Sequence, residues 1–364
     1  MAELPKIPTQ VVGSWCKPKW LCDHDLVYGP EGTWWRVDEP DREEAFDDSV
    51  RLALADQRDA GLSYLCDGEQ RRQTFSGHFY SLGGIDNETL GEVTDFRNDI
   101  GEFLTMKARA QAEGEEAPPP PKFEQPRAVG PITWDGPILA GAARFLVTES
   151  DRPTKMTVIG PNTLALRLVD EHYGSLEKLT LAVADALNAE CRALADAGID
   201  LVQIDEPEVH FRHSQVEGFA VEAIDRCLAG VEATTAVHMC YGYAKNIAEK
   251  RATPVYERAV ELLSATTADA LSLEYEQPAH GPELLTHAGD KTVLLGVLDL
   301  GTDAPVETPE HIEQRARAAM EVTGPDRLGL APDCGMWFLP RDTARAKIGA
   351  MEQAAAAIRA GLGT

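Results

Sequence analysis

The sequence predicts an α/β fold in which eight parallel strands alternate with helices and close into a barrel. Apolar runs of strand length recur at 9–13, 62–67, 156–160, 200–205, 234–240, 270–275, 292–300 and 327–332. Strands that are apolar along most of their length belong to a parallel sheet buried on both faces. Eight strand–helix units are the number that closes a TIM (β/α)8 barrel. A doubly wound open sheet is the second interpretation.

Amphipathic stretches of helical period separate most of these runs. The clearest of them are Leu176 to Ala197, Val216 to Leu228, Pro309 to Val322 and Arg341 to Leu362. Two regions break the alternation: the tryptophan-rich residues 15–40, and residues 84–155, which include a further predicted helix near 138–147. We interpret these regions as insertions after the first and second strands of a single barrel domain spanning 1–364.

Composition limits the class of partner. The chain has 364 residues, a formal net charge of −26 and a pI near 4.7. Nucleic acid is not an expected partner, because phosphate binding needs clustered Lys and Arg. No apolar segment approaches the roughly 20 residues that span a bilayer, so no membrane association and a cytoplasmic location are expected. Seven scattered cysteines favour free thiols in a reducing compartment. The oligomeric state stays open, a homo-oligomer included.

Residues suited to binding a metal stand at the ends of predicted strands. His238 and Cys240 end the fifth run, and residues i and i+2 of a strand point to the same side. Glu274 and Cys334 end later runs, and a barrel brings such ends together. Two thiolates, one imidazole and a carboxylate suit tetrahedral zinc. The alternatives are a half-buried histidine beside a core thiol, and a salt bridge for Glu274.

Other polar residues follow strand ends and would share the same mouth of the barrel. They are Gly13-Ser14, Asp67-Gly68-Glu69, Gly160 to Thr163, Asp205-Glu206-Pro207, Asp299 and Asp333. A carboxylate such as Asp205 or Glu69 in this position can bind an ammonium group. The alternatives are a helix cap for Asp205 and a surface charge beside Arg71 for Glu69.

Several of these segments together resemble the catalytic half of cobalamin-independent methionine synthases. They are Val12-Gly13-Ser14, Asp67-Gly68-Glu69, Gln203 to Pro207, His238 to Gly242, Ser272-Leu273-Glu274, Gly296 to Asp299 and Pro332 to Gly335, in the same order over nearly the whole chain. The resemblance implies a short, single-barrel form. It also implies zinc held by His238, Cys240, Glu274 and Cys334, and transfer of an alkyl group to a zinc-bound thiol such as homocysteine. By the same resemblance Gly13, Ser14, Glu69 and Asp205 would hold the amino-acid end of that substrate.

Zinc would supply a chemical need of such a reaction. A free thiol has a pKa of about 8.5, and only its thiolate is a good nucleophile. Coordination to zinc removes the thiol proton, and thiolate ligands leave the bound sulfur electron-rich. Alkyl transfer to sulfur is therefore the expected chemistry, with Asp299 and Glu69 as the expected catalytic residues.

Two positions differ from the methionine synthase pattern. The family has a histidine just after its Gly-Val-x-Asp segment, where this chain has Gly301, and a tryptophan after its Gly-Pro-x-Thr motif, where this chain has Arg167. Asp299 or a histidine from another loop would then have to protonate the departing donor. The methyl donor stays open among a methylated folate, a corrinoid protein and a small methylated compound.

Three functions fit these observations. The first is a zinc-dependent S-methyltransferase that acts on a homocysteine-like thiol. The second resembles epoxide:coenzyme M transferases, which share this barrel; Arg71, with Lys17, Lys19 and Arg72, would then contact a sulfonate. The third is a zinc-binding homologue without methyl transfer. Asp205 discriminates between the first two, because only homocysteine carries an ammonium group.

Overall fold

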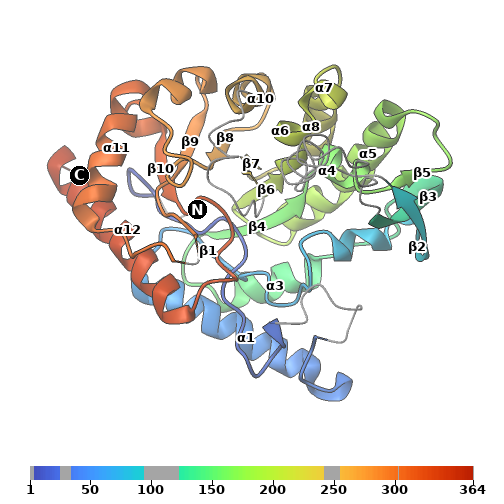
Figure 1. Cartoon of the computed structure of the whole chain (residues 1–364). Helices are drawn as coiled ribbons and strands as arrows, with labels where there is room; N and C mark the ends of the chain where they lie inside the picture. The colour runs from blue at the N-terminus through green and yellow to red at the C-terminus, as the bar shows by residue number, and fades with distance from the viewer. Residues whose placement is uncertain (1–3, 25–33, 94–122, 242–254, 302, 364) are drawn as a thin grey trace, which may run out of the picture.

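Seven strands of the described part of the chain form one curled, fully parallel sheet. The computed structural model of the chain describes residues 4–24, 34–93, 123–241, 255–301 and 303–363. Seven strands pair in the order β1-β4-β6-β7-β8-β9-β10, which is also their order in the chain (Figure 1). Their bounds are Leu65–Cys66, Thr154–Ile159, Leu201–Asp205, Thr234–Met239, Ala270–Leu273, Thr292–Gly296 and Leu328–Ala331. The strand order never reverses, as it would in a doubly wound sheet, so the predicted barrel class is confirmed.

Residues 8–10 close the gap between the two edge strands. Thr9 O accepts hydrogen bonds from Ser63 N at 2.9 Å and Tyr64 N at 3.1 Å, next to β1. On the other side, Leu330 N of β10 donates to Pro8 O at 2.9 Å, and Gln10 N donates to Leu330 O at 3.1 Å. The expected strand at 9–13 is thus a single bridge at Thr9, because only these few backbone groups pair.

Helices surround the sheet (Figure 1). They are α1 (Glu39–Ala60), α3 (Ala140–Glu149), α4 (Pro161–Ala165), α5 (Leu176–Asp196), α6 (Pro207–Phe211), α7 (His213–Val216), α8 (Ala220–Leu228), α10 (Val255–Ser264), α11 (Pro309–Thr323) and α12 (Arg341–Leu362). Short 3-10 turns lie at Gly77–Ser81, Pro282–Ala288 and Pro325–Arg327. The Ser175 side chain caps α5 and the Thr308 side chain caps α11, each by accepting a backbone N–H. In the described part of the chain, no helix is long and apolar enough to cross a bilayer.

The predicted helix from Val216 to Leu228 begins later than expected. Val216 ends α7, and α8 starts at Ala220. Gly218 separates the two pieces, and glycine is a poor helix former.

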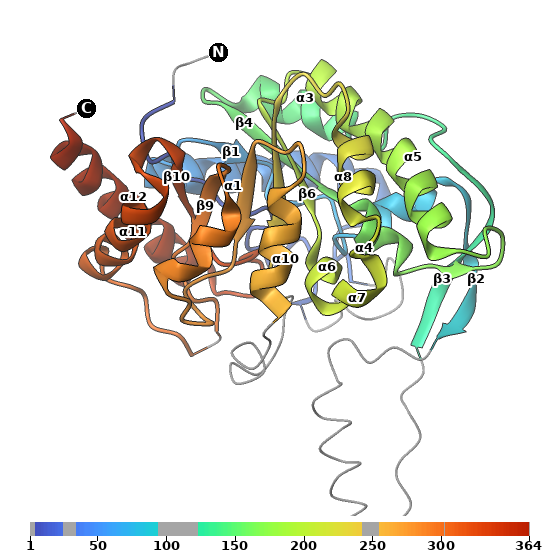
Figure 2. The same ribbon diagram turned by 90° about the horizontal axis from the view of Figure 1, so that it is seen from above.

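A second, small sheet lies beside the barrel. β2 (Gly83–Val93) pairs antiparallel with β3 (Phe123–Thr133) (Figure 2). β3 also pairs parallel with β5 (Val169–Asp170) (Figure 1). β2, β3 and α3 all fall within the region 84–155 or at its edge, whereas residues 94–122, like 25–33, lie outside the described residues. The sequence did not indicate these strands, because the β2 segment has few apolar side chains.

Buried Glu190 of α5 fastens the segment between β3 and α3. Its carboxylate accepts hydrogen bonds from Trp134 Nε1 at 2.8 Å, Ile138 N at 2.8 Å and Leu139 N at 2.6 Å. The side chain is fully buried, so these donors replace the water that the charge would otherwise need.

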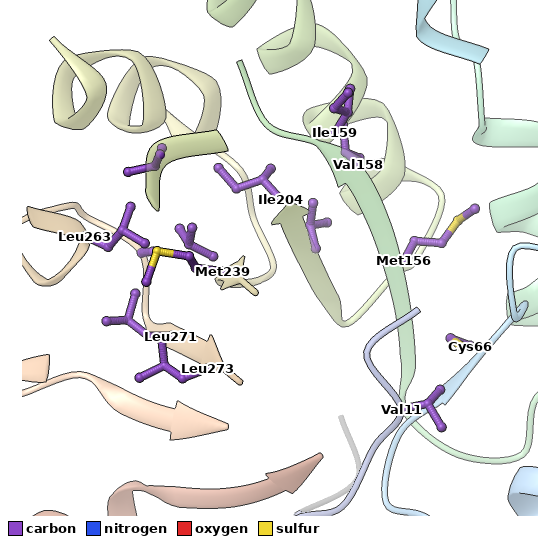
Figure 3. Close-up of a cluster of buried hydrophobic side chains, with 14 of the residues drawn as sticks. Val11, Cys66, Met156, Val158, Ile159, Ile204, Met239, Leu263, Leu271 and Leu273 are labelled. Atoms are coloured by element: carbon purple, nitrogen blue, oxygen red, sulfur yellow. The ribbon is translucent and has the colours of Figure 1, made fainter. Parts of the chain in front are cut away.

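Alternation along the strands separates two environments. Val202, Ile204, Met239 and Leu271 belong to the large cluster packed with the helices, and the last three are labelled in Figure 3. The intervening positions include a small separate cluster: Tyr64, Leu201, Ala236, Ala270 and Leu294. Further along the same strands this second face becomes polar, with Gln203, His238 and Ser272. The strand alternation therefore places polar side chains at the carboxyl ends, where barrel enzymes carry their sites.

Candidate metal and substrate site

Three candidate ligands meet where β7 and β10 end. The ligand atoms of His238, Cys240 and Cys334 all lie within 4.8 Å of one another. Cys334 Sγ donates to Cys240 Sγ at 3.4 Å, which is too long for a disulfide of about 2.05 Å. Two zinc–sulfur bonds of about 2.3 Å can span up to about 4.6 Å, so both thiols can reach one ion.

The imidazole of His238 is oriented by its far nitrogen. Nδ1 lies 3.0 Å from Ser272 Oγ and 3.2 Å from Ser272 O, on the neighbouring strand β8. Nε2 is buried and makes no hydrogen bond within the described part of the chain. A histidine that ligates a metal typically binds a protein oxygen through its other nitrogen, so the arrangement fits a metal ligand.

Electrostatics at the cluster favour a bound cation. The hydrogen bond with Cys240, followed by burial, raises the pKa of Cys334 well above its usual range. Burial opposes protonation of His238, but the charges of Cys240 and Asp205 raise its pKa overall. Two adjacent thiols cannot both ionise without a positive charge between them, and a metal ion supplies that charge.

Glu274 lies next to this cluster. Its side chain is fully buried, and Oε2 accepts a hydrogen bond from Tyr241 N at 2.8 Å, one residue beyond Cys240. Glu274 is not one of the three residues whose ligand atoms are mutually within 4.8 Å. The structure therefore brings together three of the four expected ligands and places the fourth, the carboxylate of Glu274, beside them.

Asp333 shapes the two loops that carry Glu274 and Cys334. Its Oδ1 accepts from Tyr275 N at 3.1 Å and Glu276 N at 2.9 Å, and its Oδ2 accepts from Gln277 N at 2.6 Å. These donors follow Glu274 directly, and Asp333 itself precedes Cys334. One buried carboxylate thus holds two ligand-bearing loops together.

Gly13 and Glu69 approach each other closely at the ends of the first two predicted strands. A Cβ at Gly13 would lie 2.6 Å from Glu69 Oε1 and 2.9 Å from Thr157 Cγ2, so a side chain here would displace these buried groups. Glu69 adopts a positive φ of 54°, and its Oε1 accepts from Thr157 Oγ1 at 2.7 Å. Ser14 is buried, and its carbonyl accepts from Met336 N at 2.9 Å, two residues after Cys334. The expected amino-acid site and the metal cluster are therefore linked.

Asp205 lies beside the metal cluster, paired in register with His238 across β6 and β7. Its Oδ1 accepts from Gln203 Nε2 at 2.7 Å. Burial, followed by the negative charge of Glu69, raises the pKa of Asp205 to about 7. A cation beside Asp205 would lower this pKa and favour the ionised carboxylate.

The next residue, Glu206, acts as a helix cap instead. Its carboxylate accepts from Asn162 N at 3.0 Å, Asn162 Nδ2 at 2.8 Å, Thr163 N at 2.8 Å and Thr163 Oγ1 at 2.7 Å, at the start of α4. A Cβ at Gly160 would lie 2.2 Å from Glu206 Cδ. The Gly160 to Thr163 segment is thus explained by Glu206, and burial raises the pKa of that carboxyl to about 7.

The comparison with known families identifies the chain. A family model described as "Cobalamin-independent synthase, Catalytic domain" matches residues 138–357, more than half of the sequence. The chain belongs to the cobalamin-independent methionine synthase family.

Individual members of this family match the chain over nearly its whole length. A methionine synthase of Sulfurisphaera tokodaii is 28% identical over 352 residues, which cover 96% of this chain and 91% of that protein. A B12-independent methionine synthase from Shewanella sp. W3-18-1, solved in complex with selenomethionine, is 29% identical with a TM-score of 0.83 and covers 98% of this chain and 99% of its own. A Listeria monocytogenes structure has a TM-score of 0.71 at 18% identity, which supports the fold alone.

Asp299 and Arg71, two other expected site residues, have local partners. Asp299 is half-buried, and its Oδ1 accepts from Gly301 N at 2.7 Å. The Arg71 guanidinium pairs with Glu43 at 2.7 Å and with Asp47, both on α1. Arg71 therefore forms ion pairs with α1.

The two positions that differ from the methionine synthase pattern also have defined surroundings. A Cβ at Gly301 would lie 3.2 Å from both Asp299 Oδ1 and Gln277 Nε2. The Arg167 guanidinium lies 4.9 Å from the centre of the Phe75 ring, and its Nη2 lies 3.5 Å from Glu208 Oε1. Arg167 therefore contacts the ring of Phe75, at the position where the methionine synthase pattern has a tryptophan.

Buried basic residues surround Glu69 and Asp205, and sequence reasoning missed Lys155 among them. Lys155 of β4 is 1% exposed and donates to Val11 O at 2.8 Å, and burial lowers its pKa to about 8. Arg72 is also buried and donates to Thr157 O at 2.7 Å. Lys17 donates to Glu69 O at 2.6 Å. A lysine inside the buried strand 154–159 was the one signal that could have pointed to this charge network.

Proposed function

We propose that this protein is a zinc-dependent methyltransferase that transfers a methyl group to the sulfur of homocysteine, forming methionine. The observation that carries the proposal is the cluster of His238, Cys240 and Cys334 at the carboxyl ends of barrel strands. Family membership supports it, as does the selenium analogue of methionine bound to the Shewanella relative.

His238, Cys240 and Cys334 would hold the zinc ion, with Glu274 as the fourth ligand. This donor set fits zinc. The Nε2 atom of His238 has no hydrogen-bond partner among the described residues, and a bound metal ion would satisfy it. Bound zinc would keep a substrate thiol ionised near neutral pH.

Asp205 and Glu69 would bind the ammonium group of homocysteine. Asp205 ends β6 and Glu69 follows β1, and Gly13 leaves the space beside Glu69 that a side chain would fill. Ser14 would contact the same end of the substrate. An ammonium ion would also relieve the cost of ionising Asp205.

The reaction forms a bond between the substrate sulfur and the methyl carbon while the bond from that carbon to the donor breaks. If the donor is a methylated folate, the nitrogen that leaves must take up a proton. Asp299 is the candidate to supply it, because it lies after β9 and is half-buried. A methylated folate is the first donor to test, followed by a corrinoid protein and small methylated compounds.

The proposal is tested first by metal content and product. We expect about one zinc ion per purified chain, and a thioether of homocysteine detectable by mass spectrometry when thiols and donors are combined. Removing zinc with a chelator should abolish the product, and adding zinc should restore it. A protein that binds no zinc, or that binds zinc yet alkylates no thiol with any donor, would overturn the proposal.

Two matched variants separate homocysteine from a sulfonate thiol. Asp205→Asn should raise the KM for homocysteine about 10-fold to 100-fold, the loss of one hydrogen bond to a charged group, with zinc content unchanged. Arg71→Ala should leave that KM unchanged, because Arg71 pairs with Glu43 and Asp47. The reverse pattern would favour an enzyme of the coenzyme M type.

A further inference from the structure

The hydroxyl of Tyr256, on α10, joins the ends of two strands that carry candidate ligands. It donates to Met239 O at 2.9 Å and accepts from Glu274 N at 3.0 Å. Met239 stands between His238 and Cys240 in the chain. The Tyr256 oxygen therefore bonds to the backbone of Glu274 and to that of Met239, which adjoins both His238 and Cys240.

The strands separate at this point. β7 and β8 pair in register from Ala236 with Ala270 to Met239 with Leu273. The next bond, from Glu274 N to Met239 O, is 3.4 Å long, beyond the usual 2.9–3.0 Å or so. The Tyr256 hydroxyl bonds to both groups of this stretched pair, so it bridges the strands where their direct hydrogen bond is long.

The ring that carries this hydroxyl is held rigidly. Tyr256 is 1% exposed, and its ring stacks on Tyr241 with centroids 4.4 Å apart and planes 10° apart. His280 stacks on Tyr256 at 5.1 Å, and its Nε2 lies 2.9 Å from Tyr241 Oη. Burial raises the pKa of Tyr256 well above its usual range, so the hydroxyl keeps its proton.

We propose that Tyr256 is a positioning residue that sets the separation of the β7 and β8 ends, so that Cys240 and Glu274 face one metal ion. This inference rests on the zinc site of the proposed function. The hydroxyl acts on the backbone at Met239 and Glu274. Loss of such outer contacts typically weakens metal binding 10-fold to 100-fold or so.

The test compares Tyr256→Phe with Tyr275→Phe. The first variant keeps the stacked ring and removes the bridge. The second removes a buried hydroxyl that has no hydrogen-bond partner in the described part of the chain, one residue after Glu274. Zinc affinity, measured by competition with a chromogenic chelator, should fall about 10-fold to 100-fold for Tyr256→Phe and stay within about twofold for Tyr275→Phe.

Two further readouts distinguish positioning from general packing. The visible spectrum of the cobalt-substituted protein reports ligand geometry and should change only in Tyr256→Phe. Saturating zinc should restore much of the methylation rate in that variant. Equal zinc affinity and equal cobalt spectra in both variants and the parent would overturn the inference and leave the proposed function standing, whereas a parent protein without zinc would overturn the function itself.

Discussion

Replacing Asp333 by asparagine should destabilise the protein by about 3 kcal/mol. The carboxylate accepts three successive backbone N–H groups, two on Oδ1 and one on Oδ2. An asparagine can keep its carbonyl toward Tyr275 and Glu276, but its NH₂ group then faces the N–H of Gln277. One hydrogen bond to a charged acceptor, worth about 1.5–3 kcal/mol, is lost, and the two that remain become neutral and weaker.

Urea denaturation of the metal-free protein measures this loss without a contribution from zinc. Asp290→Asn is the control, because Asp290 is exposed and lies 3.7 Å from Arg327 at the surface; its unfolding midpoint should not move. Zinc affinity should also fall in Asp333→Asn, since the loops of Glu274 and Cys334 lose their common anchor. A change in unfolding free energy below about 0.5 kcal/mol, the range of ordinary surface changes, would refute the reasoning.

Two other substitutions test structural roles away from the metal. Glu190→Ala should lower the unfolding free energy by about 2–4 kcal/mol, because three donors between β3 and α3 lose a buried acceptor; an unchanged urea midpoint would contradict this. His280 has its pKa lowered to about 4, first by burial and then by Arg315. The unfolded chain therefore binds more protons between pH 6.5 and 4, and stability falls as the pH falls through that window. His280→Gln should flatten this fall in urea titrations, and an equally steep fall would show that other groups cause it.

The barrel could be predicted because its signals are local. Near-continuous apolar runs, separated by helical periods, mark strands buried on both faces, and α12 runs from Arg341 to Leu362 as expected. The first strand was overestimated, because Val11 and Val12 are buried by packing without pairing in a ladder. The small sheet was missed, because β2 and β3 expose much of their surface and carry little apolar pattern.

The candidate site could also be predicted only in part. Residues at strand ends, such as His238 and Cys334, could be named because the barrel geometry converts chain position into spatial position. The contacts that orient them could not be named. Tyr256 and Ser272 act through backbone or a neighbouring strand, and a tyrosine in a helix looks the same in sequence whether its hydroxyl bridges two strands or reaches water.

The contacts between residues 6–9 and α12 limit how the chain can fold during its synthesis. Thr9 Oγ1 donates to Glu352 of α12, 343 positions away, and Arg359 of the same helix bonds the carbonyls of Lys6 and Ile7. A nascent chain emerging from the ribosome cannot form these contacts until α12 has been translated. Ser14 likewise contacts Met336, in the loop that leads from Cys334 to α12. A polypeptide truncated before α12 should therefore be easily digested by proteases and unable to retain zinc.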